Sequence, residues 1–201
     1  RKANYRLCFQ ISFLNSLLCE TQNSQITDLN ILNPNIEKEY KNDKESRLDV
    51  KAKLNDGKLV NIEVQIQYEK NIDKRTLYYW SRIYSQQLKT GRAYYELNKT
   101  ITINILCFEY FEHQYIHSSY NIRHDKNHEI LTDDLEIHVI ELPKLLKYKQ
   151  EMNETLKTWL IFLIDPENVV IEEKKEEMKE MVEAVELLET NGNYLRKNSL
   201  K

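Results

Sequence analysis

The 201-residue chain carries 29 basic and 32 acidic residues and a formal net charge of −3, which argues against a uniformly basic nucleic-acid-binding protein. Its three cysteines are too few and too widely spaced for a disulfide framework or a zinc site. Residues 1–20 lack the layout of a signal peptide, and no run approaches the ~18 apolar residues of a membrane-spanning helix. We therefore expect a cytoplasmic protein with no membrane partner.

The domain organisation is indicated by what the chain lacks. It contains three glycines and three prolines, and no linker rich in Gly, Pro or Ser divides it. We expect one sizeable domain over residues 1–165 and a charged helical extension over residues 166–201. Because the sequence begins with Arg1 and not with methionine, we expect either that its start has been trimmed or that the first part of this domain is missing.

The first element in the chain is a predicted amphipathic helix. Apolar side chains recur at helical spacing from Asn4 to Leu18. The segment Ile26–Ile36 follows and contains the turn signal Asn33-Pro34. We expect this segment to connect the helix to the next element with little regular structure.

The segment Ser46–Gln67 alternates apolar and polar residues in two arms, a pattern typical of a β-hairpin with one buried face. One face of the two arms is apolar and carries Leu48, Val50, Ala52, Leu54, Val60, Ile62, Val64 and Ile66. The opposite face carries Asp49, Glu63 and Gln65.

The pairing of the two arms depends on the turn between them. A two-residue loop, Asp56-Gly57, would set Asp49 opposite Val64, whereas a three-residue loop that also includes Asn55 sets Asp49 opposite Glu63. We favour the three-residue loop, because it alone puts all eight apolar side chains on one face.

Two carboxylates side by side on a sheet repel each other unless a cation lies between them. Ligands that are all oxygen suit a hard cation such as Mg²⁺. Asp49 and Glu63 are therefore candidate metal ligands. The alternative, which the pattern supports equally well, is that both are solvent-facing residues of an ordinary amphipathic hairpin.

A second helix is predicted from Asp73, as its N-cap, to about Lys89, before Gly91. We expect most of its apolar and aromatic side chains, Leu77 and Tyr78 among them, to lie in the core. Guanidinium groups on such a helix can form paired bonds to phosphate oxygens. Three of its polar side chains are candidates for phosphate contacts: Arg75, Arg82 and Gln87.

The rest of the chain predicts three strands and two helices. The strands are Thr100–Phe108, which is continuously apolar, Tyr120–Arg123, and Leu135–Leu142, which ends before Pro143. A helix around Trp159–Leu163 should pack on the sheet, and the order of elements fits an α/β sandwich with a mixed sheet. The charged helix Glu172–Glu189 has an apolar stripe that suits docking on the domain, which we favour, or a homodimer.

An Asp, a β-turn and then Glu-x-Gln on the next strand resemble the core of the PD-(D/E)XK nucleases. From about Phe13 to the Trp159 region, the chain resembles the Rpn family of recombination-promoting nucleases and transposases. The resemblance is carried by LDVKAKLNDGKLVNIEVQ, RTLYYWSRIYSQQLKTGRAYYELNKTITINIL and LEIHVIELPK. It implies a restriction-endonuclease-like mixed β-sheet flanked by helices.

The resemblance also implies an activity: a Mg²⁺-dependent DNA endonuclease, with Mn²⁺ as a substitute, that promotes recombination. Asp49, Glu63 and the carbonyl of Val64 would hold the metal, and Gln65 stands where many relatives carry Lys. Gln65 would orient the attacking water without adding charge. The alternative is a catalytically inactive remnant or a nucleic-acid-binding protein that keeps the fold.

Charge is unevenly distributed along the chain. Residues 41–100 contain 13 basic and 8 acidic residues, whereas the remainder contains 16 basic and 24 acidic ones. A locally basic segment around an acidic pair would attract DNA while holding a metal. We expect a DNA-binding groove with Asp49, Glu63 and Gln65 as its floor and Lys51, Lys53, Arg75 and Arg82 along its sides.

Overall fold

The computed structural model of the protein describes residues 2–18, 25–32, 50–149 and 151–164. The chain divides into two compact units, one made of residues 1–28 and 149–201 and the other of residues 29–148. The predicted helix Glu172–Glu189 lies outside the described residues. Within the described ranges, no helix has the length and apolar content needed to cross a membrane.

The first unit contains helices α1 (Lys2–Leu18) and α4 (Glu154–Ile164), which confirm the two helices predicted for these segments. The two helices pack through aromatic side chains, because the Phe13 ring meets the Trp159 ring edge-on at 5.9 Å between centroids. Asn15 fixes the chain after α1, since its amide group both donates to and accepts from the backbone of Ile26 at 2.8 Å.

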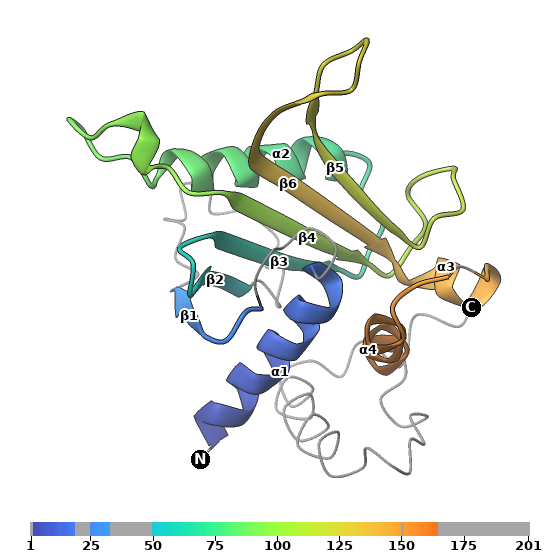
Figure 1. The fold of residues 1–201 in the computed structure, drawn as a ribbon. Helices are drawn as coiled ribbons and strands as arrows, with labels where there is room; N and C mark the ends of the chain where they lie inside the picture. The colour runs from blue at the N-terminus through green and yellow to red at the C-terminus, as the bar shows by residue number, and fades with distance from the viewer. Residues whose placement is uncertain (1, 19–24, 33–49, 150, 165–201) are drawn as a thin grey trace. The chain divides into compact units, whose positions relative to one another are not determined.

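The second unit is built on a mixed six-stranded sheet with the order β1-β2-β3-β4-β6-β5 (Figure 1). The strands are β1 (Leu29–Leu32), β2 (Val50–Leu54), β3 (Leu59–Gln65), β4 (Thr100–Leu106), β5 (His117–Arg123) and β6 (Ile130–Glu141). Strands β3, β4 and β6 are parallel to one another, and the other neighbours pair antiparallel. This arrangement confirms the predicted α/β class and is consistent with a restriction-endonuclease-like fold.

The hairpin β2–β3 has the predicted register. Val50 pairs with Ile62 and Ala52 with Val60, as the three-residue loop requires. The Leu54 amide donates to the Lys58 carbonyl at 2.9 Å, which closes the loop. Gly57 has φ +92°, a left-handed conformation that a residue with a Cβ rarely adopts. The turn therefore sets which hairpin side chains share a face.

Strand β1 corrects the expectation of little regular structure in this part of the chain. Leu29–Leu32 pairs antiparallel with β2, and Leu29 is buried. A four-residue edge strand is stabilised mainly by pairing with its neighbour, so its own sequence gives a weak signal. The residues after Leu32 in the predicted connection, 33–36, lie outside the described part of the chain.

The strands at the other edge of the sheet are longer than predicted. β5 begins at His117 and not at Tyr120, and β6 begins at Ile130 and not at Leu135. The added residues form the outer parts of an antiparallel hairpin, where exposed polar residues hide the alternation. Pro143 follows the end of β6 and lies in the first turn of an unpredicted short helix, α3 (Leu142–Lys147).

Helix α2 (Ile72–Ser85) crosses the sheet and contacts β4 (Figure 1). It is shorter than predicted and its N-cap is Asn71, so Asp73 lies in its first turn. The expectation that Leu77 and Tyr78 lie in the core is wrong, because about half of each side chain is exposed. Only the narrow side of the helix that faces the sheet is buried, with Ile72, Thr76 and Ile83.

Candidate active site

The polar face of β3 forms a row of buried side chains. Asn61, Glu63 and Gln65 alternate with Val60 and Ile62, so they share one face of the sheet. Glu63 is 3% exposed. Its Oε1 accepts a hydrogen bond from Asn61 Nδ2 at 2.9 Å, and its Oε2 accepts one from Gln65 Nε2 at 3.3 Å. The alternative of a solvent-facing hairpin residue is therefore wrong for Glu63.

Helix α2 brings a cation to this carboxylate. Arg75 Nε lies 3.6 Å from Glu63 Oε2, and Arg75 Nη1 lies 3.7 Å from Glu69 Oε2. The guanidinium also lies over the Tyr79 ring, 5.0 Å from its centroid. A buried carboxylate needs such compensation, because removing an ion from water costs on the order of several kcal/mol.

Strand β4 extends the polar row. The parallel register pairs Asn61 with Thr102 and Glu63 with Asn104, so these side chains lie on the same face. Thr76 Oγ1 donates to Asn104 Oδ1 at 3.2 Å and links the row to α2. The Thr102 hydroxyl is buried and has no hydrogen-bond partner among the described residues. An orphaned oxygen in a row that contains a carboxylate is a feature of sites that receive a further ligand.

The two predicted lysines of β2 share the face of Glu63. Lys51 pairs with Asn61 and Lys53 with Leu59, as the register requires. Lys51 is half-buried, and burial lowers the pKa of its ammonium group. Lys53 is exposed. The sheet therefore puts two cations beside the polar row, on the side away from β4.

Not every predicted site residue meets this row. Arg82 lies further along α2, where its Nη1 donates to the Tyr78 hydroxyl at 3.2 Å. Gln87 lies beyond the helix and holds the segment that leads into β4: its Nε2 donates to the Asn98 carbonyl at 2.9 Å, and its Oε1 accepts from the Asn98 amide at 3.0 Å. Asp49, the predicted partner of Glu63, lies outside the described residues.

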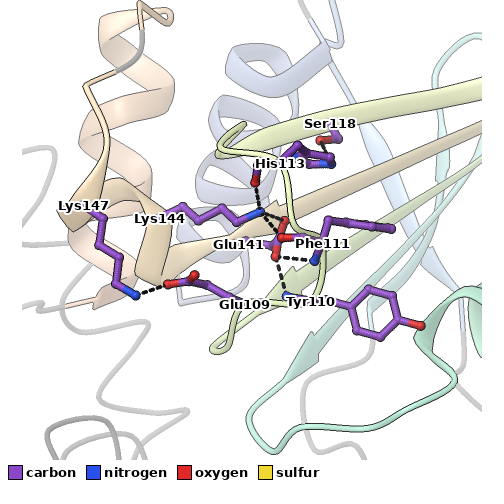
Figure 2. Close-up of polar contacts among 8 residues, drawn as sticks. All are labelled: Glu109, Tyr110, Phe111, His113, Ser118, Glu141, Lys144 and Lys147. Atoms are coloured by element: carbon purple, nitrogen blue, oxygen red, sulfur yellow. Dashed lines mark hydrogen bonds and ion pairs between the residues drawn. The ribbon is translucent and has the colours of Figure 1, made fainter.

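A second buried network lies at the end of β6 (Figure 2). Glu141 and Lys144 are each 1% exposed, and Lys144 Nζ lies 2.7 Å from Glu141 Oε2. The backbone amides of Tyr110 and Phe111 donate to Glu141 Oε1. Lys144 Nζ also donates to the carbonyls of Phe111 and His113. The pair therefore fixes the loop that follows β4.

That loop in turn reaches the start of α2. The Tyr110 hydroxyl lies 2.9 Å from Asp73 Oδ1 and 3.1 Å from the Lys70 carbonyl, and its bond lowers the pKa of the Asp73 carboxyl. Sequence reasoning missed the Glu141–Lys144 pair. The available signal was a Glu at the end of the apolar strand and a Lys three residues later, since charge at buried positions is rare unless it is paired.

The fold and the site together define a class: an α/β protein of restriction-endonuclease-like architecture with a buried, carboxylate-centred polar site on its central strands. A family model described as PD-(D/E)XK nuclease family transposase matches residues 9–198, so the chain belongs to this family. This confirms the predicted resemblance and gives the protein a nuclease-type function. Comparisons with curated proteins and with solved structures gave no match.

PD-(D/E)XK nucleases typically use divalent metal ions. The polar row fits such an ion, since it offers carboxylate, amide and hydroxyl oxygens, including the orphaned Thr102 hydroxyl. In the part of the chain that the structure describes, no group of three or more His, Cys, Asp or Glu side chains could hold a metal. A metal at Glu63 would therefore need a further ligand.

Proposed function

We propose that the protein is a Mg²⁺-dependent DNA endonuclease, with Mn²⁺ as a substitute, that hydrolyses phosphodiester bonds and promotes DNA recombination. The hairpin register is the observation that carries the proposal. Val50 pairs with Ile62, which is the register under which the sequence predicts Asp49 opposite Glu63. In this proposal Asp49 would be the second carboxylate beside the buried Glu63 and the further ligand that a metal requires.

In this proposal, Asp49, Glu63 and the Val64 carbonyl hold the ion. The bound ion would polarise the scissile phosphate and lower the pKa of a water molecule. Gln65 is oriented by the bond from its Nε2 to Glu63, so its Oε1 can accept a hydrogen bond from the attacking water. Because an amide is neutral, Gln65 positions this water without stabilising negative charge as a lysine would.

The cations around the polar row would hold the DNA. Lys51 and Lys53 share the face of Glu63, and Arg75 lies beside the carboxylate itself. Arg82 adds a further cation on α2, whereas Gln87 would act indirectly, by holding the backbone at Asn98. Contacts to phosphate position DNA without reading bases, so cleavage should show little sequence preference.

A plasmid-nicking assay tests the proposal. The purified chain should nick supercoiled plasmid in Mg²⁺ or Mn²⁺ and not in EDTA. Asp49→Ala and Glu63→Gln should each reduce the rate by about 100-fold or more, since each removes a metal ligand. Glu129→Gln, an exposed carboxylate in the β5–β6 turn, is the matched control and should leave the rate unchanged.

Two results would contradict the proposal. Equal nicking by the wild type and by Glu63→Gln would mean that the activity does not use this carboxylate. Absence of nicking with either metal, together with retained DNA binding, would favour the alternative of a nucleic-acid-binding protein that keeps the fold. Thermal unfolding of each variant would show that a loss of activity is not a loss of structure.

A further inference from the structure

The flank of α2 that lies toward β3 alternates cations and aromatic rings. Arg75 contacts Glu63 of β3, whereas the Tyr84 hydroxyl bonds Asp134 of β6 on the other side of the helix. Along the β3 flank, Arg75 covers the Tyr79 ring, Tyr79 meets Tyr78 edge-on at 5.5 Å between centroids, and the Arg82 guanidinium lies 5.9 Å from the Tyr78 centroid. Tyr78 is 49% exposed despite these contacts.

The segment that follows α2 exposes two more aromatic rings. Tyr94 is 81% exposed and Tyr95 is 88% exposed, and both lie in the 3₁₀ helix η1 (Tyr94–Glu96). Two contacts hold this segment. The Leu97 amide bonds the Tyr94 carbonyl at 3.1 Å, and Arg92 pairs with Glu96 at 3.3 Å. The segment therefore holds these rings in solvent, although burying them would be favourable.

The segment with the exposed tyrosines leads into β4, the strand that pairs with β3 at the candidate active site. Figure 1 shows the segment after α2 extending from the same end of the sheet as the β2–β3 turn. Leu59 pairs with Thr100, where this segment enters β4, and Glu63 pairs with Asn104. Four residues of strand, about 13 Å, separate these two pairs. A DNA strand that ran along the sheet from the start of β4 to Glu63 would cover this length with about four nucleotides, and Tyr95 precedes the start of β4 by five residues.

We propose that Tyr78, Tyr94 and Tyr95 stack on unpaired bases, so that the preferred substrate is DNA with a single-stranded segment next to the cleaved bond. This inference rests on the proposed function. Aromatic rings stack on any base and therefore bind single strands without sequence preference. In an intact duplex the faces of the bases are covered by their neighbours, so exposed rings would add little to binding.

The charges of the same segment suit a nucleic acid. Lys89 and Arg92 precede the two tyrosines, and Arg82 stands on the helix that leads to them. Glu96 is the acid of the segment and is paired with Arg92, so this pair has no net charge and the positive charge comes from Lys89 and Arg82. Cations interleaved with aromatic rings are the combination by which proteins bind single-stranded nucleic acid, the cations meeting phosphates and the rings meeting bases.

Binding measured in EDTA tests the inference without any cleavage. Fluorescence anisotropy would compare a labelled 20-nucleotide single strand with the matching duplex. The double variant Tyr94→Leu, Tyr95→Leu keeps apolar side chains but removes both rings. Its affinity for the single strand should fall by about tenfold or more, and its affinity for the duplex by about twofold at most. The control Tyr115→Leu, at a tyrosine that is also exposed, should change neither.

Three results would overturn the inference: no change in affinity for the single strand, an equal loss for both forms of DNA, or sedimentation showing a self-association that the double variant loses. The last would mean that the rings contact a second copy of the chain. Failure of the proposed function is detected by a different measurement, the rate of plasmid nicking by the wild type and by Glu63→Gln. If the wild-type protein nicks plasmid and the double variant binds single strands as tightly as the wild type, this inference alone is refuted.

Discussion

Lys144→Met should lower the free energy of unfolding by about 3–5 kcal/mol, the usual effect of removing one partner of a buried ion pair. Lys144 Nζ donates to Glu141 Oε2 at 2.7 Å, to the Phe111 carbonyl at 2.9 Å and to the His113 carbonyl. Methionine fills much of the same volume but donates no hydrogen bond, so a buried carboxylate and two carbonyls lose their donor. The cavity term should therefore be small compared with the polar one.

Urea and thermal unfolding monitored by circular dichroism would measure this change. For a unit of this size, a loss of this magnitude corresponds to a decrease in Tm of about 10–20 °C. Lys147→Met is the matched control, because Lys147 is a neighbouring lysine that pairs with Glu109 (Figure 2), and both side chains of this pair are partly exposed. The midpoint of this control should equal that of the wild type.

A double-mutant cycle separates the lost charge pair from a general packing defect. Glu141→Gln combined with Lys144→Met removes the buried negative charge while keeping an oxygen that can accept from the Tyr110 and Phe111 amides. The double variant should be more stable than Lys144→Met alone by about 1 kcal/mol or more. A loss below about 1 kcal/mol in Lys144→Met would refute the reasoning. So would a double variant that is no more stable than Lys144→Met.

Burial, with a smaller effect from His138, lowers the pKa of His117 from 6.5 to about 4. Between these pH values the unfolded chain therefore binds more protons than the folded one, so the free energy of unfolding should fall as the pH decreases from 6.5 to about 4. His117→Phe should reduce the dependence of the urea unfolding midpoint on pH across this window. Gly57→Ala should destabilise the protein by about 1–2 kcal/mol in urea unfolding. Residue 57 has φ +92°, and the Cβ of the new alanine would lie 3.0 Å from a side-chain oxygen. Gly91→Ala should lower the stability less, because residue 91 has φ +84° but no atom lies within 4 Å of the new Cβ. Lys51→Ala with Lys53→Ala should reduce the salt slope of DNA binding by about two units, and an unchanged slope would mean that DNA lies elsewhere.

The sequence alone determined the features that depend on neighbours a few residues apart. Both arms of the β2–β3 hairpin alternate, and Asn55–Gly57 supplies a turn with one left-handed residue, so the register followed without any tertiary information. The continuous apolar run of β4 predicted a central strand for the same reason, since it has no polar face to turn to solvent. The hairpin pattern likewise identified Glu63 as a site candidate.

Only the tertiary structure decided which distant groups meet. Arg75 reaches Glu63 because α2 crosses the sheet beside β3, and Lys144 reaches Phe111 because β4 and β6 are neighbours. No spacing in the chain encodes these contacts, since each depends on strand order and on the direction of a helix across a sheet. For the same reason Gln87, predicted from sequence as a DNA contact, bonds the backbone beside it in the folded protein: local patterns show that a side chain is polar, whereas strand order and helix direction determine what it binds.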